Sequence, residues 1–371
     1  MTISHAEPGD RGITITWEDK STADYPYVYL RDNDPNDLHP QTRERVFDLT
    51  TIELPIRPAL HGLSAAGLRV CWPDKQQPSV YSSAWLQRHR PGKRRADASN
   101  VERLAWDEKS LDSIPRRNAP DCTNNASALR DALITLKRYG ILLLDSLEDS
   151  LDASKNFGDH IGFRRRTNFG DMFDVVNLPD PNNLAYTSIA LPLHTDLPNQ
   201  EIVPGYQLLH CYRNNVTGGE SIFADGLKIC EDLRSDAPED FALLQSVQIP
   251  WRFHDAANDI RSHRPIITLR ADGSVDYFVF NAHIADVPDL PADLLDEFYL
   301  AYQRLMQRIR DPKYAIQHAL QPGEMVIFDN TRVLHSRAAF DSASGERYLR
   351  GYYIERNEID SRIRVLDRKE K

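Results

Sequence analysis

Short apolar runs separated by turn residues recur through most of this chain, and they restrict it to a fold built mainly from β-strands. Residues 141–144, 206–211 and 221–226 are examples, with the turn Thr217-Gly218-Gly219 between the last two. Helical periodicity is confined to a few segments. Many strands with few helices predict a double-stranded β-helix, or jelly roll, with helices buttressing one face.

Two segments have the apolar spacing of an amphipathic helix. The first begins at Ala126 and is closed by Gly140, directly before the strand at 141–144. The second covers residues 292–309. The side chains expected on the buried faces are Leu129, Leu133 and Leu136 in the first helix and Leu295, Phe298, Tyr302 and Leu305 in the second.

The N-terminal part alternates short β-type runs with turn signals, which predicts a small β-rich domain over residues 1–95. Its expected strands lie at residues 12–17, 27–30, 45–49 and 68–72. Residues 96–125 are polar and are expected to form a linker, and the basic run 88–95 is interpreted as solvated rather than as an anion site. The jelly-roll domain is then expected over residues 126–371.

Composition excludes several classes of partner. A chain of 371 residues with 41% hydrophobic content can bury a substantial core. Its formal net charge of -10 argues against nucleic acid and anionic membranes, since both require an excess of cations. No apolar run approaches the roughly 18 to 20 residues of a membrane span, and the polar start lacks a signal-peptide core. We therefore expect a cytoplasmic protein with no membrane or nucleic-acid partner.

Two histidines and one aspartate form a candidate metal site. His194 and Asp196 are two residues apart in the extended stretch 191–196, so both side chains can point to one place. His335 follows an apolar strand that begins at Val326 and runs into a turn. Two imidazoles and one carboxylate are the facial set that leaves three positions open on Fe(II). Among twelve histidines any single one is weak evidence, and the competitors are His210, His254, His263 and His283.

A cation for an acidic cosubstrate follows the last of these histidines. Arg347 lies in the predicted strand 346–353, where its guanidinium could bind the distal carboxylate of 2-oxoglutarate with two parallel hydrogen bonds. The alternative is a surface salt bridge, for which Arg350 is equally suited.

Together these residues resemble the taurine-dioxygenase-type superfamily of Fe(II)/2-oxoglutarate oxygenases. The chain is most similar to its γ-butyrobetaine hydroxylase and trimethyllysine hydroxylase branch, whose N-terminal Leu-Arg-Asp-Asn appears here at residues 30–33. The resemblance covers most of the chain and implies a homodimeric dioxygenase that uses Fe(II), 2-oxoglutarate and O2. It assigns iron to His194, Asp196 and His335, and 2-oxoglutarate to Arg347. The competing histidines fall on no ligand position of the family.

The chain departs from the resembled branch at its N-terminal zinc site. Members that bind zinc supply three cysteines after Arg-Asp-Asn and a histidine after Trp-Pro-Asp. Those four positions here read Asp34, Asn36, His39 and Gln76. The set offers no thiolate, and the four cysteines of the chain are far apart, so we expect no zinc.

The resemblance also implies a substrate site. Four aromatic residues fall on positions of the cage that surrounds a trimethylammonium group, namely Phe169, Phe173, Tyr186 and Tyr353. Two are phenylalanine where the family has a tyrosine and a tryptophan. Such a group has no N–H to donate, so aromatic faces bind it, at about 0.5–2 kcal/mol per contact. Asn183 and Asn281 match positions that hold the anionic end of the substrate.

The position of Arg350 bears on the choice of substrate. In a regular strand it faces away from Arg347, so it reaches the substrate only through a bend or bulge near Gly351. One additional cation would suit a dianionic phosphonate, and the favoured reaction is hydroxylation of 2-(trimethylammonio)ethylphosphonate. The alternatives are γ-butyrobetaine, which would give L-carnitine, and trimethyllysine. For the amino-acid end of trimethyllysine, the sequence offers no clear binding residue. A non-catalytic jelly-roll ligand-binding protein is disfavoured because all four metal and cosubstrate positions are retained.

Overall fold

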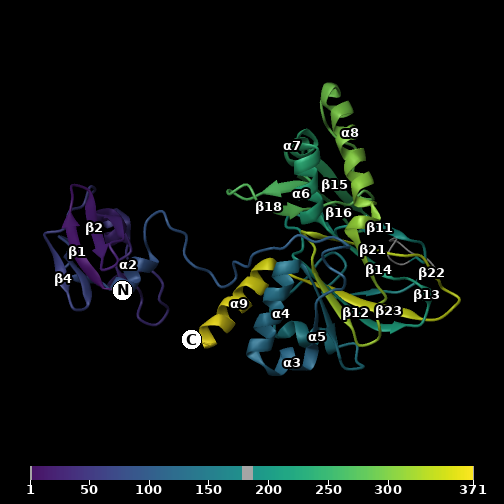
Figure 1. Cartoon of the computed structure of the whole chain (residues 1–371), viewed down its shortest axis with the longest axis horizontal. Coiled ribbons are helices and arrows are strands. Elements are labelled where there is room, and N and C mark those ends of the chain that lie inside the picture. The colour runs from purple at the N-terminus through teal and green to yellow at the C-terminus, as the bar shows by residue number, and fades with distance from the viewer. Residues whose placement is uncertain (1, 178–186, 371) are drawn as a thin grey trace. The chain divides into compact units, whose positions relative to one another are not determined.

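The structure, a computed structural model, describes residues 2–177 and 187–370. The chain divides into two compact units, Met1–Asp97 and Ala98–Lys371 (Figure 1). Within the described residues, no helix has both the length and the apolar character needed to cross a bilayer.

The described part of the first unit contains two antiparallel three-stranded sheets around one core. Their strands are β1 (Ile3–Pro8), β2 (Gly12–Trp17) and β3 (Thr22–Pro26) in one sheet, and β4 (Leu60–Ser64), β5 (Gly67–Cys71) and β6 (Ser79–Tyr81) in the other. The helical segments are α1 (Tyr27–Asp32), α2 (Ser83–Arg88), η1 (Pro35–Asp37) and η2 (Leu49–Thr51). Strand β2 buries alternate residues, as a strand with one face on a core must.

The predictions for two of the four strands expected in this unit are wrong. Residues 27–30 belong to helix α1, and residues 45–49 form no strand beyond an isolated bridge at Arg45. Tyr27, Leu30 and Arg31 are the buried residues of α1, and their spacing of three and four is helical. Packing on the core therefore overrides the β propensity of this aromatic, β-branched sequence.

An ionic network includes Asp34, which stands at the first of the three positions where the zinc-binding members carry cysteines. The buried carboxylate of Asp34 pairs with Lys75 at 2.6 Å and accepts a hydrogen bond from Ser79. Arg31 is buried between Asp37 and Asp74, and its Nε donates to a carboxylate oxygen of Asp74 at 3.0 Å. In this unit, charge pairs link η1 to the loop after β5.

The larger unit contains two main sheets within the described residues. One has the order β10, β23, β12, β20, β8, β7, with β9 also paired to β23, and the other has the order β11, β21, β14, β19. The strands of the first are β7 (Arg116–Asn118), β8 (Ile141–Asp145), β9 (Arg164–Arg165), β10 (Phe173–Val175), β12 (Tyr206–Asn214), β20 (Met325–Asp329) and β23 (Arg347–Ile354). Those of the second are β11 (Leu191–His194), β14 (Ser221–Asp225), β19 (Ala315–His318) and β21 (Val333–Arg337).

Three short pairs extend from these sheets: β13 (Thr217–Gly218) with β22 (Phe340–Asp341), β15 (Ile249–His254) with β16 (Asp259–Arg264), and β17 (Ile267–Leu269) with β18 (Val275–Phe278). The helices are α3 (Ala119–Asn124), α4 (Ala126–Tyr139), α5 (Ala153–Asp159), α6 (Gly226–Asp236), α7 (Pro238–Ser246), α8 (Ala292–Ile309) and α9 (Arg356–Glu370), with the turn η4 (Pro312–Tyr314).

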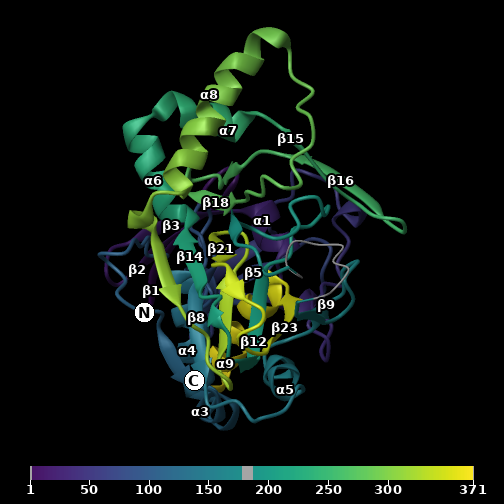
Figure 2. The same ribbon diagram turned by 90° about the vertical axis from the view of Figure 1, so that its right-hand side faces the viewer.

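The two main sheets face each other across an apolar core, which confirms the predicted jelly roll. Phe328 of β20 and Phe223 of β14 meet there with ring centroids 5.5 Å apart. The outer face of the larger sheet is covered by α4, α5 and α9, and that of the smaller sheet by α6, α7 and α8 (Figure 1 and Figure 2). Helices therefore flank both faces rather than the expected one, because the outer faces of both sheets are apolar.

The helices predicted from apolar spacing are confirmed. Helix α4 runs from Ala126 to Tyr139 and ends on Gly140, whose φ of 74° suits a glycine at a helix C-terminus. Helix α8 covers the predicted range 292–309.

The predicted linker 96–125 is part of the larger unit from Ala98 onward, so most of it is not a linker despite its polarity. Strand β7 pairs in parallel with β8, and Trp106 is 1% exposed in the core between the sheets. The backbone N–H of Trp106 donates to Asp225 at 3.0 Å. Apolar residues this widely spaced give no period in the sequence, yet each fills a separate position in the core.

Candidate active site

Strand pairing brings His194 and His335 together. β11 and β21 are antiparallel neighbours with these two residues in register, and their ring centroids lie 4.3 Å apart. His335 lies in the middle of β21, so the turn expected to end on it is complete three residues earlier, at Arg332. One potential ligand atom from each of His194, Asp196 and His335 lies within 4.8 Å of the others.

The hydrogen bonds orient these groups toward one point. The Nε2 atom of His194 is 3.3 Å from Oδ1 of Asp196, and Nε2 of His335 is 3.7 Å from Oδ2. The Nδ1 atom of His194 lies 2.8 Å from the carbonyl oxygen of Pro192, and because a carbonyl can only accept, Nδ1 carries the proton. Nε2 is thereby the nitrogen that faces a metal, which would displace the proton that the contact with Asp196 favours there.

The site is electrostatically prepared for a cation. Burial lowers the pKa of His335 to about 3, with a smaller effect from His194, so this imidazole is neutral. Burial alone would raise the pKa of Asp196, but His335, His194 and Tyr353 outweigh it and hold the pKa below its ordinary value. An ionised carboxylate beside a neutral imidazole is the form in which both bind metals.

Buried hydrogen bonds fix the backbone that carries His194 and Asp196. Thr195 and Phe280 exchange hydrogen bonds through the Thr195 amide, at 2.7 Å, and the Thr195 hydroxyl, at 2.9 Å. Asn330, which is fully buried, accepts from the Asp196 N–H at 2.7 Å and donates to the Asp196 carbonyl at 2.9 Å. Asn330 therefore ties Asp196 to the turn that precedes His335.

Sequence reasoning predicted a turn here but missed its burial. Residues 329–332 read as a polar connection between two apolar strands, yet all four are buried. Arg332 pairs with Asp225, its Nε donating to Oδ1 at 2.8 Å and its Nη2 to Oδ2 at 2.7 Å. The only sequence signal of this burial is that four residues with hydrogen-bonding side chains follow one another without a glycine or proline.

Arg347 has the environment of an anion-binding residue. It lies on the inner face of β23, is 9% exposed, and its guanidinium carbon lies 5.6 Å above the Phe340 ring. Among the described residues, no carboxylate lies within ion-pairing distance and Nε has no hydrogen-bond partner. Burial lowers its pKa to about 10, and the neighbouring Arg337 adds to the effect. A buried cation in this state is stabilised by an incoming carboxylate.

Arg350 does not occupy the position that the phosphonate prediction required. It lies on the opposite face of β23 from Arg347, and its Nε donates to Asp174 at 2.7 Å. The register of β23 with β10 is unbroken through Gly351, so the required bulge is not present there. A β-carbon at Gly351 would lie 2.6 Å from ring carbons of Phe173, so the glycine makes room for this ring instead.

Three of the four residues predicted to form an aromatic cage lie in ring contacts. Phe173 contacts Tyr353, with ring centroids 5.4 Å apart, while Phe169 contacts Phe253 of β15, also at 5.4 Å. No pattern in the sequence singled out Phe253. Tyr186 and Asn183 lie outside the described residues.

Asn281 is engaged in local hydrogen bonds. Its side-chain N–H donates to the Thr195 carbonyl at 3.3 Å, and its oxygen accepts from the His283 amide at 3.1 Å. In this structure Asn281 supports the backbone beside His194 and Asp196.

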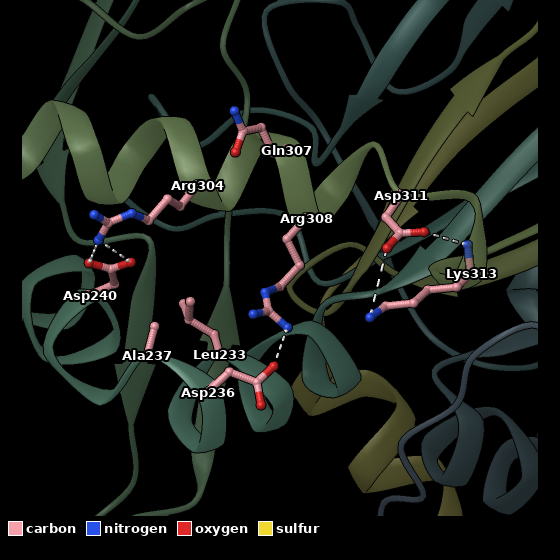
Figure 3. A pocket seen from close by; sticks show the side chains of 9 residues that line it. All are labelled: Leu233, Asp236, Ala237, Asp240, Arg304, Gln307, Arg308, Asp311 and Lys313. Carbon is pink, nitrogen blue, oxygen red and sulfur yellow. Dashed lines mark hydrogen bonds and ion pairs between the residues drawn. The ribbon is translucent and has the colours of Figure 1, made fainter.

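The structure also contains a surface pocket of about 380 Å³ that none of these residues lines (Figure 3). It lies among α6, α7 and the end of α8. Its basic side chains pair with carboxylates of the pocket: Arg304 with Asp240, Arg308 with Asp236 and Lys313 with Asp311. The charges of this pocket are therefore mutually compensated, unlike that of Arg347.

The geometry agrees with comparisons to known proteins. The sequence profile of the taurine catabolism dioxygenase TauD/TfdA family matches residues 110–353. The chain belongs to this family. Like other TauD/TfdA proteins, it is an Fe(II)- and 2-oxoglutarate-dependent dioxygenase that consumes O2, and its reaction is a hydroxylation. Two imidazole nitrogens and a carboxylate oxygen suit Fe(II).

Relatives cover both units of this TauD/TfdA protein. Residues 5–87 match the N-terminal region of γ-butyrobetaine hydroxylase-like proteins. A γ-butyrobetaine dioxygenase of Pseudomonas sp. (strain AK-1) is 33% identical over 96% of this chain and 94% of its own length. A trimethyllysine dioxygenase of Meyerozyma guilliermondii is 25% identical over 96% of this chain and 93% of its own. The solved structure of an asparagine oxygenase shares the fold, with a TM-score of 0.51 and 18% identity over 64% of this chain and 83% of that one.

Proposed function

We propose that the protein hydroxylates γ-butyrobetaine, a trimethylammonium carboxylate, with iron bound by His194, Asp196 and His335 and 2-oxoglutarate bound by Arg347. The observation that carries the proposal is the nearly full-length similarity to a γ-butyrobetaine dioxygenase, which exceeds that to the trimethyllysine enzyme. The convergence of the three metal-ligand candidates supports it independently.

The ion pair of Arg350 favours a carboxylate over a phosphonate. The phosphonate prediction depended on an additional unpaired cation beside Arg347. Asp174 holds the guanidinium of Arg350 through two hydrogen bonds, at 2.7 and 3.2 Å. A guanidinium that is already paired on the outer face of the strand contributes little to binding the second negative charge of a phosphonate. We therefore revise the favoured substrate to γ-butyrobetaine, whose anionic end is a singly charged carboxylate.

Each part of the proposed site has a separate role in the reaction. Iron held by the three metal-ligand candidates would activate O2: one oxygen atom would enter succinate as 2-oxoglutarate loses CO2, and the other would hydroxylate the substrate. Arg347 binds the distal carboxylate of 2-oxoglutarate, where its buried charge is compensated on binding. The rings of Phe173 and Tyr353 present faces to the trimethylammonium group, and the surrounding sheets exclude water.

The test is a comparison of three substrates. Purified protein with Fe(II), 2-oxoglutarate and O2 is given γ-butyrobetaine, trimethyllysine or 2-(trimethylammonio)ethylphosphonate, and succinate and hydroxylated product are quantified. We expect γ-butyrobetaine to have the highest kcat/KM, with near-equal succinate and product. His335→Ala and omission of Fe(II) should abolish both.

A higher kcat/KM for the phosphonate or for trimethyllysine would overturn the substrate assignment. Absence of Fe(II)-dependent turnover with every amine would instead favour a non-catalytic binding protein. The homodimer and the cytoplasmic location stay predictions.

A further inference from the structure

We propose that Tyr353 is a positioning residue that holds the carboxylate of Asp196 and links the metal site to an aromatic wall, which consists of the rings of Phe173 and Tyr353 itself. The inference rests on the proposed function in that the wall is taken to contact the substrate. The hydroxyl role itself concerns only the metal ligands, so it can be measured without substrate.

The hydroxyl of Tyr353 donates to Oδ2 of Asp196 at 2.7 Å. Tyr353 lies on the inner face of β23, a central strand paired with both β12 and β10, and is 4% exposed. An aspartate carboxylate can rotate about its Cβ–Cγ bond, and Asn330 restrains only the backbone of Asp196. Apart from the two histidines of the metal site, which lie 3.3 and 3.7 Å from the carboxylate, the phenol is the contact that fixes Oδ2 and, with it, the direction of Oδ1.

The ring of the same residue meets Phe173. Phe173 pairs with Gly351 across β10 and β23, and the missing β-carbon at Gly351 leaves room for its ring. The ring centroids of Phe173 and Tyr353 are then 5.4 Å apart at an interplanar angle of 35°. One side chain thus touches an aromatic residue of the wall with its face and a metal-ligand candidate with its hydroxyl.

This arrangement has two consequences. Loss of the hydroxyl should weaken metal binding, because outer-shell partners of metal ligands typically contribute about 10- to 100-fold in metal affinity. Ligand contact with the ring should also restrain the phenol, and therefore Asp196, so the hydroxyl should favour coupling of 2-oxoglutarate consumption to hydroxylation.

The experiment compares Tyr353→Phe with Tyr352→Phe in the full-length protein. Tyr352 is the adjacent residue on the opposite face of β23, and its buried hydroxyl donates to the Ser154 carbonyl at 2.5 Å. Both variants lose one buried hydroxyl and keep the ring. Co(II) affinity is measured by visible absorption without cosubstrate or substrate, and urea unfolding reports stability separately.

We expect Co(II) binding to weaken about 10-fold or more in Tyr353→Phe and to change less than about twofold in Tyr352→Phe. With γ-butyrobetaine, Tyr353→Phe should form more succinate per hydroxylated product than the wild type, while the KM for 2-oxoglutarate stays unchanged. Tyr353→Leu should add a rise in the KM for the amine, because it also removes the ring.

Wild-type Co(II) affinity in Tyr353→Phe would overturn the inference, as would an equal loss in both variants. Failure of the proposed function is distinguishable. If the wild type binds Co(II) but hydroxylates no trimethylammonium compound, the substrate proposal fails while the metal titration still decides the role of Tyr353.

Discussion

Two arginines three positions apart in β23 lie on opposite faces of the strand, and this difference determines the environment of each guanidinium. Arg347 faces the interior with no carboxylate near it in the described structure, whereas Arg350 faces outward and is compensated by Asp174. Both are cationic and both follow His335, so their chemistry alone does not separate them. What distinguishes them is the face of the strand on which each side chain lies.

The pair provides a matched test of cosubstrate binding. Arg347→Met should raise the KM for 2-oxoglutarate about 10- to 100-fold, because a hydrogen-bonded charge pair contributes about 1.5–3 kcal/mol. Arg350→Met should leave this KM within about twofold. The readout is initial-rate succinate formation at varied 2-oxoglutarate, and equal effects of the two substitutions would contradict the assignment to Arg347.

At the scale of elements, charge pairs hold the N-terminal unit where α1 and η1 meet the loop after β5. The side chain of Arg31 is 3% exposed and that of Asp74 is 27% exposed. Hydrogen bonds from Arg31 lower the pKa of Asp74, chiefly because they favour the ionised carboxylate. The folded-state pKa thus lies below the unfolded value, so the stabilisation is present above that value and is lost as the pH falls through the folded pKa.

Asp74→Asn should therefore destabilise this unit at pH 7, by about 2 kcal/mol, and the difference from the wild type should shrink in acid, below about pH 4. Hydrogen exchange of β2 and β5 in the full-length protein, with both forms compared at each pH, measures the effect. Asp10→Asn is the control, because Asp10 is 93% exposed in its pair with Arg57. A difference that persists unchanged in acid would refute the ionic explanation.

The whole molecule consists of two units with separate cores, and the metal-ligand candidates all belong to the larger one. Metal binding is therefore expected to stabilise one unit and leave the other unchanged. The apo form should stay folded, since large apolar cores lie on both sides of the smaller sheet.

Calorimetry can test this expectation. Co(II) at about 100 times its Kd should stabilise the larger unit by about 2.7 kcal/mol, which raises the Tm of one unfolding transition, and EDTA should reverse the change. The transition of the N-terminal unit should not move. A shift of equal size in His335→Ala would exclude the proposed ligand set.

Features that depend on local pattern and residue chemistry could be predicted from the sequence. Periodicity predicted α4, α8 and the apolar strands of the jelly roll, and the spacing of His194 and Asp196 predicted that they would point to one place. Those predictions succeed because the period of an element is set by its own backbone.

Only the tertiary structure decided which polar groups are buried and paired. It brought Asp174 to Arg350 across 176 residues of sequence, Asn330 to Asp196 across 134, and Tyr353 to Asp196 across 157. It also buried Trp106 in a segment that resembles a linker. The physical reason is that the partners of these groups are distant in sequence, so the pairing of strands and the turns between them determine which groups meet.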